Sequence, residues 1–582
     1  MAITQLVNSE YLPMPSPKSR LRVGVILDAW LVPLWIRRIL QEIDESKFAE
    51  LALIIIANSN ASVSASALVF RGDAPALLRL WWRLDRRLFG HRSAKPHALD
   101  LVRFIPQGAH PELLESTPVK FDSGFSFAEV DFEKIMAGRL DVLLSVGMGT
   151  PDPRLQKSAK FGVWTFKDAA QSLASLFWTL YDNSSVVTNE LHVSSPWLGS
   201  STVLCSCFAA DRYSFFRNCI NLCWNRSPTV MRGLKNLHQD LQPMRDSRTA
   251  LATLRQTPVR NSDLVRLVPR LLKRAASDQL RKRLMRERWF IAFRKISGEG
   301  RPAEVGGEFT LITPPHGRCY ADPFVVERNG KNYIFFEDYS CERGKAVISF
   351  IEVDPDGQCS APEVALEEDH HLSFPCVFVW RDEVYLLPET KSNRTIQLYR
   401  TTDFPRGWQL SHVLLRGVAA VDSTLLHHKG KFWLFTSGIR TEDSWFDGDS
   451  ELFLFFSDSL FGPWKAHPRN PIAADVRNCR SAGQLYHWNG ELIRPAQDCS
   501  TVYGCAVVFN RVDVLSEFDY RETPVATISP EWMRNNLGTH TFNCNHQYEV
   551  LDGRTLGRRF FRSVTNSTIE TVTPLAPVMK YI

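Results

Sequence analysis

Residues 422–435 read DSTLLHHKGKFWLF: an apolar strand, a polar turn with glycine, and a second strand rich in aromatic residues. The same unit occurs at 322–336 (DPFVVERNGKNYIFF), 375–387 (PCVFVWRDEVYLL) and 482–493 (AGQLYHWNGELI), with a diverged copy at 539–551 (THTFNCNHQYEVL). Successive copies lie about 50 residues apart, the length of one four-stranded propeller blade. We therefore predict a five-bladed β-propeller over residues 304–582.

Upstream of these repeats, strands alternate with helices. Apolar runs at 22–27 (RVGVIL), 51–57 (LALIIIA) and 141–146 (DVLLSV) predict buried strands, and the spacing of apolar residues predicts helices over 30–43 and 127–140. Weaker patterns predict strands at 101–105 and 162–166 and a short helix at 153–160. This alternation is typical of a largely parallel α/β sheet. We expect it over residues 21–210, after a flexible N-terminus at 1–20.

Residues 211–303 form a basic, helical connector in this scheme. Ten Lys and Arg side chains crowd between 270 and 295, with leucines at steps of three and four residues. An amphipathic basic helix can lie on an anionic membrane surface or attract an anionic substrate. It can equally be a linker whose apolar side packs between domains. Both interpretations stay open, and the first of them includes peripheral contact with a membrane.

Composition limits the classes of protein to consider. The 582 residues carry 69 Lys and Arg against 63 Asp and Glu, a net charge of +6 that is too small for a dedicated nucleic-acid binder. The longest apolar stretches fall short of a membrane span, and the first twenty residues lack the order of a signal peptide. The 12 cysteines show no zinc spacing and are interpreted as reduced thiols. We expect a cytoplasmic protein with no metal site.

Several segments of the repeats resemble one known domain: 321–324 (ADPF), 387–390 (LPET), 482–485 (AGQL), 494–500 (RPAQDCS) and 538–543 (GTHTFN). This is the N-terminal domain of plant glucosamine inositolphosphorylceramide transferases, which is similar to the five-bladed propellers of arabinanase- and xylosidase-type glycosidases. The resemblance covers roughly residues 304–556. It implies a carbohydrate or glycolipid substrate.

The α/β region resembles the N-terminal domain of formyltransferases that use 10-formyltetrahydrofolate. The segments that carry this resemblance are DVLLSVGMG at 141–149 and GVWTFK at 162–167. It implies a Rossmann-like sheet, and 10-formyltetrahydrofolate as the cofactor if the domain is active. In the family pattern, Asn and His stand where this chain has Thr165 and Lys167. Because Lys stays protonated near pH 7 unless burial lowers its pKa, Lys167, held by the adjacent Asp168, replaces a proton shuttle with a fixed charge.

Asp322 and Asp422 open equivalent blade strands, in the contexts ADPF and VDST. Two carboxylates brought from different blades to one pocket could supply the acid and the base or nucleophile of glycosidic chemistry. The resemblance to glycosidases implies a general base at Asp322 and an orienting aspartate at Asp422. Glu389, at the far end of its hairpin, is the third catalytic candidate, and Glu337 and Asp338 stand at the same end of theirs. Aspartates at strand starts also cap turns, and that structural reading stays open for both.

A second group of residues is predicted to bind substrate. Arg494 could hold a carboxylate or phosphate with two hydrogen bonds, next to Gln497 and Asp498. The alternative for Arg494 is an ion pair that joins blades. His540 and Asn543 lie in the fifth repeat, where a lone His can also be a satisfied core residue.

These observations favour a carbohydrate-active, transferase-like protein of surface glycan or glycolipid biosynthesis. Its fold class is α/β plus all-β. Were the N-terminal domain active, it would transfer a formyl group to an amino sugar. One alternative is a glycosidase or glycosyltransferase that acts through Asp322 and Asp422. Another is a glycan-binding scaffold without catalysis.

Overall fold

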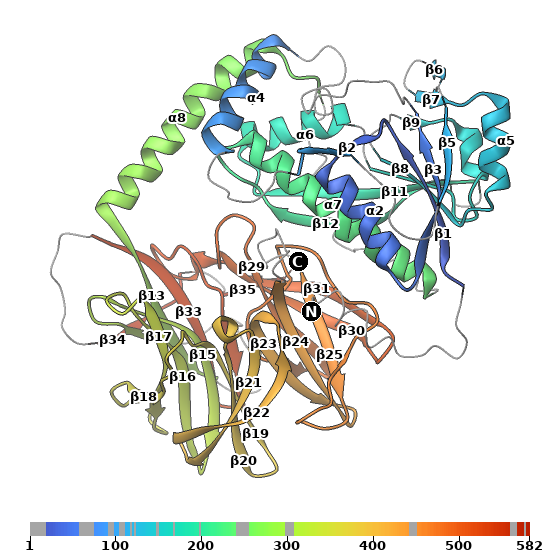
Figure 1. The fold of residues 1–582 in the computed structure, drawn as a ribbon. Coiled ribbons are helices and arrows are strands. Elements are labelled where there is room, and N and C mark those ends of the chain that lie inside the picture. Colours follow the sequence, from blue (N-terminus) through green and yellow to red (C-terminus); the bar gives the residue numbers. More distant parts are fainter. Residues whose placement is uncertain are drawn as a thin grey trace. The chain divides into compact units, whose positions relative to one another are not determined.

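The computed structural model describes residues 19–57, 75–90, 98–103, 111–116, 119–121, 124–146, 150–166, 169–196, 199–239, 255, 257–296, 308–440, 451–558, 567–575 and 578–581. The chain divides into two compact units, with the boundary between Ala275 and Ala276. Each unit is described by itself (Figure 1).

The N-terminal unit is built on a seven-stranded sheet with the order β12-β11-β10-β8-β1-β3-β5. Its strands are β1 (Leu21–Leu27), β3 (Ala49–Ile56), β5 (Glu112–Glu115), β8 (Val142–Ser145), β10 (Val163–Phe166), β11 (Val186–Ser195) and β12 (Gly199–Ala209). The first five run parallel, and β11 and β12 are antiparallel. The central strands are apolar throughout because both faces of the sheet are covered. The α/β prediction is confirmed as a mixed sheet with helices, and the formyltransferase resemblance stays a prediction.

The helices of this unit are α2 (Leu34–Glu45), α4 (Ala76–Phe89), α5 (Glu129–Ala137), α6 (Ala169–Asp182) and α7 (Phe215–His238), with a 3₁₀ turn, η1, at Pro153–Lys157. The short strands are β2 (Leu31–Pro33), β4 (Leu101–Arg103), β6 (Val119–Phe121), β7 (Gly124–Ser126) and β9 (Thr150–Pro151). The strand predicted at 101–105 is β4, which pairs with β2 outside the seven-stranded sheet.

The range 211–303, predicted as a connector, holds three different elements. α7 packs against α2 and β11, so it belongs to the α/β unit. α8 (Asn261–Leu284) contains the boundary between the units. β13 (Met285–Lys295) is a strand of the C-terminal unit, where a continuation of the basic helix was expected. Five consecutive apolar residues, 289–293, stand between its charged ends, and residues 290–294 are all buried, as in a strand that is covered on both faces.

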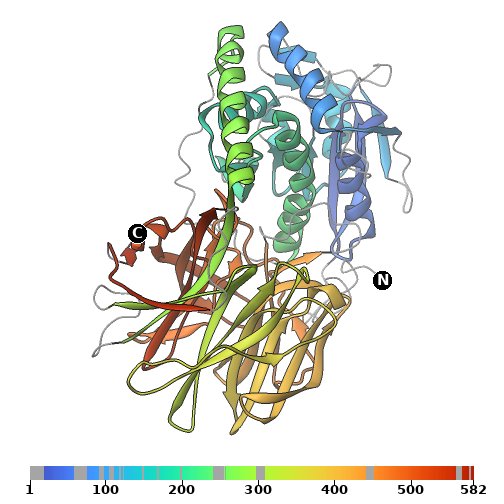
Figure 2. The ribbon, with the colours of Figure 1, turned by 90° about the vertical axis from the view of Figure 1, so that its left-hand side faces the viewer.

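The C-terminal unit is a five-bladed β-propeller, as the repeats predict (Figure 2). Blade one holds β15 (Arg318–Arg328), β16 (Lys331–Ser340), β17 (Lys345–Val353) and β18 (Glu363–Leu366). Blade two holds β19 (Ser373–Trp380), β20 (Glu383–Glu389), β21 (Thr395–Asp403) and β22 (Arg406–Arg416), with the turn η2 at Lys391–Asn393. Blade three holds β23 (Ala419–His428), β24 (Lys431–Arg440), β25 (Leu452–Ser457) and β26 (Lys465–Ala466).

The last two blades include strands that lie far apart in the sequence. Blade four holds β27 (Arg480–Ser481), β28 (Tyr486–Trp488), β29 (Glu491–Asp498), β30 (Ala506–Leu515), β31 (Tyr520–Ile528) and β35 (Met579–Tyr581). Blade five holds β32 (Phe542–Cys544), β33 (Tyr548–Arg558), β13, β14 (Phe309–Thr313) and β34 (Thr568–Val572), and the turn η4 (Pro530–Trp532) precedes it. All five predicted hairpins are confirmed.

Blade five closes the ring with strands from both ends of the unit. β13 pairs with β33 along its whole length, from Met285 opposite Arg558 to Lys295 opposite Tyr548. The first strands of neighbouring blades contact one another, β15 with β19, β19 with β23, β23 with β27 and β15 with β32. These inner strands therefore surround a common centre.

All twelve cysteines lie in the described part of the chain, and none forms a disulfide there. Among the residues that the structure describes, no helix has both the length and the apolar character needed to cross a membrane.

Candidate functional site at the propeller centre

The inner strands of the first three blades share a bulge. Asp322, Phe374 and Asp422 each adopt a positive φ, of 53°, 46° and 48°, at the point where the pairing with the next strand shifts. Positive φ is costly for residues other than glycine, and such strain clusters at functional sites. The equivalent placing of Asp322 and Asp422, inferred from the repeats, is thus confirmed by backbone geometry.

Two glutamates occupy a second equivalent position. Ala321, just before the first bulge, lies opposite Glu337, and Ser373 lies opposite Glu389 in the next blade. Each glutamate is influenced by the aspartate beside it: in addition to burial, the Asp322 carboxylate raises the pKa of Glu337, and the Asp422 carboxylate raises the pKa of Glu389. Two adjoining carboxyl groups repel each other unless one of them carries a proton. The centre therefore holds two carboxyl pairs built from three blades.

Asp322 is 4% exposed, and neighbouring blades hold its side chain. One carboxylate oxygen accepts the backbone N–H of Phe374 at 3.1 Å, and the other accepts the hydroxyl of Thr541 at 2.8 Å. Blades two and five therefore fix the orientation of a carboxylate that blade one supplies.

Asp422 is bound in a comparable way by blades two and four. Its Oδ2 accepts the Nε2–H of Gln497 at 2.8 Å and the Nε–H of Arg480 at 2.5 Å. Its backbone N–H donates to Glu389 at 3.3 Å. The Arg480 guanidinium also lies 4.8 Å from the ring centre of Tyr503. A buried cation thus compensates one of the clustered negative charges.

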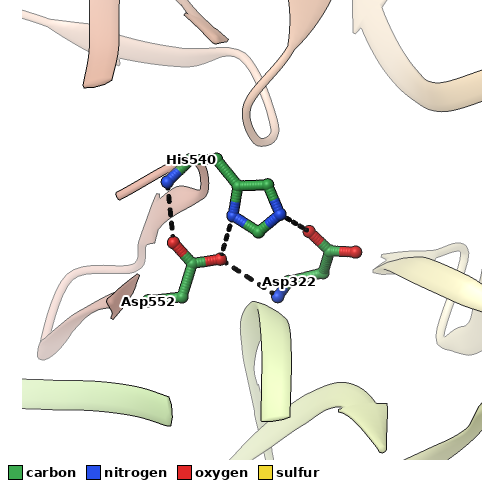
Figure 3. A group of neighbouring side chains, drawn as sticks. All are labelled: Asp322, His540 and Asp552. Carbon is green, nitrogen blue, oxygen red and sulfur yellow. Dashed lines mark hydrogen bonds and ion pairs between the residues drawn. The ribbon is translucent and has the colours of Figure 1, made fainter. Parts of the chain in front are cut away.

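His540 bridges two of the carboxylates (Figure 3). Its Nδ1 forms an ion pair with Asp552, and its Nε2 lies 3.4 Å from Asp322 Oδ1. Asp552 also accepts the backbone N–H groups of His540 and Thr541 and lies 3.3 Å from the backbone nitrogen of Asp322. The ring of Trp289 lies over the imidazole, with 4.3 Å between ring centres. Both ring nitrogens therefore face acceptors, the arrangement of a charged imidazolium.

Burial and mutual repulsion shift the pKa values of the cluster. Burial raises the pKa of Asp322 to about 6, against the lowering effect of His540. Burial and the charge of Asp422 raise the pKa of Glu389 to about 8. The pKa of Glu337 rises further above its ordinary value, because of burial and three neighbouring carboxylates. The pKa of His540 is raised: burial opposes this, but the charges of Asp552 and Asp322 prevail.

The ligand atoms of Asp322, His540 and Asp552 lie within 4.8 Å of one another, close enough to surround a metal ion. An imidazolium that is protonated on both nitrogens has no lone pair left for a metal. The observed contacts accordingly favour two ion pairs of His540, one with Asp552 and one with Asp322.

The cluster takes in five of the residues predicted from sequence: Asp322, Asp422, Glu389, Gln497 and His540. Asn543 lies close by in a supporting role, where it donates to the carbonyl of Pro323 at 2.8 Å and accepts the N–H of Gln484.

Arg494 and Asp498 have other contacts. Arg494 is fully buried and forms two hydrogen bonds of 2.7 Å with Glu522 of its own blade, so the ion pair lies within a blade. Asp498 accepts the N–H of Ser500 at 2.8 Å, a turn-capping contact. Lys167 and Asp168 lie outside the described residues.

Sequence reasoning missed Arg480, Thr541 and Asp552 as site residues, and it noted Glu337 at the end of its hairpin without counting it among the catalytic candidates. A signal existed for Glu337: it stands fifteen positions after Asp322 (337 − 322), just as Glu389 stands fifteen after Phe374 (389 − 374). Comparing the repeats at that offset would have paired the two glutamates.

Residues 315–564 match a sequence family described as glucosamine inositolphosphorylceramide transferase 1, N-terminal. Glucosamine inositolphosphorylceramide transferase 1 of Arabidopsis thaliana is 35% identical over 235 residues, which is 40% of this chain and 30% of the relative. The enzyme of the same name from Oryza sativa subsp. japonica is 33% identical over 223 residues, or 37% of this chain and 30% of the relative. The chain thus spans about 30% of the length of these curated relatives.

Solved structures of glycoside hydrolases also align with this chain. Zg3597, a family 117 glycoside hydrolase of Zobellia galactanivorans, aligns with a TM-score of 0.30 and 11% identity, over 46% of this chain and 90% of its own. CoXyl43, a GH43 β-xylosidase/α-arabinofuranosidase from a compost metagenome, aligns with a TM-score of 0.33 and 14% identity, over 49% of this chain and 100% of its own.

Proposed function

We propose that the propeller binds the sugar of a glycolipid or surface glycan and moves a glycosyl group by acid–base chemistry. The observation that carries the proposal is the placing of two glutamates, Glu337 and Glu389, at equivalent positions of their blades, where burial and the charge of the aspartate beside each of them raise their pKa values. Glycosidic chemistry requires one protonated and one ionised carboxyl group beside the same bond. Relatives named glucosamine inositolphosphorylceramide transferase support a glycolipid as the substrate class.

Glu389 suits the role of general acid. With a pKa of about 8 it keeps its proton near neutral pH, and it is the less buried member of its pair. It would give this proton to the oxygen of the departing group as the glycosidic bond breaks. Asp422, held by Arg480 and Gln497, stays in place as its partner.

Asp322 suits the role of general base. A pKa of about 6 leaves most of its carboxylate ionised at neutral pH. It would take the proton of the attacking hydroxyl, from water in hydrolysis or from an acceptor in transfer. The proton lost by Glu389 and the proton gained by Asp322 balance over one turnover.

His540 is a positioning residue in this scheme. As a cation between Asp552 and Asp322, it favours the ionised form of Asp322 among like charges. Thr541 and the Phe374 N–H fix the direction of the same carboxylate.

The experiment that tests the proposal compares Glu389→Gln with Glu383→Gln in the full chain. Glu383 lies on the same strand but is exposed and paired with Arg400, so its variant is a matched control. Turnover is measured on candidate glycolipids and on aryl glycosides with good and poor leaving groups. We expect Glu389→Gln to lose about 100-fold or more on poor leaving groups and little on good ones, which need no acid. Equal losses on both, or normal turnover, would contradict the assignment.

A second candidate, a glycan-binding protein without catalysis, is favoured by one observation. Both oxygens of Asp322 already have partners within the protein, which also fits a structural aspartate. Calorimetry with a panel of amino sugars, sugar nucleotides and glycolipid head groups separates the two. Sugar binding that survives Asp322→Asn, with no turnover by the unaltered chain, would favour binding alone.

Formyl transfer to an amino sugar stays a separate proposal for the N-terminal unit. It rests on the resemblance at 141–149 and 162–167. Titration of the full chain with 10-formyltetrahydrofolate tests this proposal, and a lack of measurable affinity would contradict it.

A further inference from the structure

Helix α4 of the N-terminal unit is firmly attached through one face. Leu78 and Trp82 are 4% exposed, and Trp82 packs edge-on against Phe215 and Phe216 of α7. Asp85, buried beside them, accepts the backbone N–H of Phe216 at 2.7 Å. The orientation of α4 is therefore fixed, and so is the face that it turns outward.

That outward face carries a row of leucines. Leu77, Leu80, Leu84 and Leu88 are 38%, 52%, 48% and 67% exposed, at steps of three and four residues. Single exposed leucines are common on proteins, but a continuous row along a helix marks an interaction surface. The helix of 14 residues extends about 21 Å.

Basic side chains lie along one side of this leucine row and continue towards the back of the helix. Arg83, Arg86 and Arg87 are exposed on the same helix. The only acidic residue of α4 is Asp85, on the buried face. The outward face thus combines apolar and positive groups without a negative one.

α8 repeats this pattern where it starts beside α4. The side chain of Asn261, its first residue, accepts the backbone N–H of Leu77. In the turns that follow, Leu264, Leu267 and Leu271 are buried, whereas Val265, Val268 and Leu272 are 64%, 37% and 65% exposed. Exposed basic residues of these turns are Arg266, Arg270 and Lys273.

From this surface we infer that α4, with the first turns of α8, binds an anionic lipid membrane in its plane. The leucines would enter the boundary between head groups and acyl chains, and the arginines would meet lipid phosphates and carboxylates. A second copy of the chain fits less well, because it would bring Arg83, Arg86 and Arg87 against their own counterparts. The inference does not depend on the chemistry proposed for the propeller.

The test is co-sedimentation of the full chain with vesicles of phosphatidylcholine, with or without about one third phosphatidylserine. We expect binding to the anionic vesicles, weakened by salt, and little binding to phosphatidylcholine alone. The variant Leu80→Glu with Leu84→Glu should bind about tenfold less or weaker still. Leu113→Glu, at an equally exposed leucine of β5, should bind as the unaltered chain does.

A second pair of variants tests whether binding needs the positive charge at Arg83 and Arg87 or the arginine side chain itself. Arg83→Glu with Arg87→Glu should also lose about tenfold or more, whereas replacement of both by Lys should keep binding. All these positions are exposed, so thermal unfolding should be unchanged and serves as the folding control. The inference is overturned if the unaltered chain does not bind anionic vesicles. It is also overturned if the glutamate variants bind these vesicles as well as the unaltered chain does. A dimer that dissociates in the leucine variant would instead identify a second copy as the occupant.

Discussion

Asp322 and Asp422 both have a positive φ, which is a strained backbone conformation for residues other than glycine. The equivalent residue of the second blade, Phe374, has the same positive φ and donates its N–H to Asp322. The bulge therefore belongs to the blade design, and its strain is present whichever residue occupies it. What aspartate adds is a carboxylate at a point where neighbouring blades converge.

The positive charge of His540 favours the ionised form of Asp322. Replacing His540 with Gln removes a cation that lowers the pKa of Asp322, so that pKa should rise. If Asp322 is the base, the acid limb of the pH–activity profile should move to higher pH by about one unit. His546→Gln, at an exposed histidine, is the control and should leave the profile in place. An unmoved limb in the His540 variant would show that His540 does not act through Asp322.

Glu389 links stability to pH. Its pKa is raised from 4.5 to about 8 in the fold, so the folded chain binds the proton more tightly than the unfolded chain. The stability from this group is present below pH 4.5 and is lost as pH rises towards 8. Removing the titrating group in Glu389→Gln should flatten this fall in thermal stability between the two pH values, and Glu383→Gln should not. A profile of Glu389→Gln identical to that of the unaltered chain would contradict the link.

Gly504 has a turn conformation that leaves room for His540. At φ +60°, a Cβ on residue 504 would lie 2.6 Å from the Cβ of His540, whereas a Cβ on Gly490, at φ +78°, meets nothing within 4 Å. Gly490→Ala should cost only the backbone strain, about 1 kcal/mol, and Gly504→Ala about 1–3 kcal/mol more. Denaturant unfolding of the two variants measures this difference, and equal losses would contradict the close approach.

Among the elements, blade four depends on a buried charge pair. Arg494 of β29 and Glu522 of β31 lie two strands apart in one sheet and bind each other with two hydrogen bonds. Arg494→Met should leave Glu522 buried and unpaired, at a cost of about 3–5 kcal/mol in unfolding free energy. Arg511→Met, which breaks the exposed pair with Asp513, should cost about 1 kcal/mol or less. A small effect at Arg494, with lost sugar binding, would restore the substrate-binding role predicted from sequence.

The hairpins could be predicted from sequence because each is a local pattern. In 322–336 and 422–435 the strand period, the turn and the second strand all lie within fifteen residues. β13 could not, since its partner β33 lies more than 250 residues away and its arginines suggested a helix. Asp552 directly follows the fifth predicted hairpin, but its contact with Asp322 spans 230 residues of sequence, and no local pattern shows it. In the α/β unit, short apolar runs identified β1, β3, β8 and β10, but they did not show the pairing of β4 with β2.

On the scale of the whole molecule, the propeller depends on the pairing of β13 with β33. Ala292 lies in the middle of β13, opposite Leu551, and is 1% exposed. Ala292→Pro should remove a ladder hydrogen bond and open the ring, with loss of cooperative unfolding. Val364→Pro, in the outermost strand of blade one, should be tolerated far better. Calorimetric unfolding compares them, and a cooperative transition in Ala292→Pro would mean that the ring does not need this closure.

The same closure sets an order of events during synthesis. Asp322, Glu337 and Glu389 leave the ribosome more than a hundred residues before His540 and Asp552, the groups that complete the cluster. β13, made before any of them, has no partner until β33 follows. An unfinished chain therefore carries most of the acidic side chains but neither His540 nor the ring that encloses them. The complete cluster can form only once nearly the whole propeller has been translated.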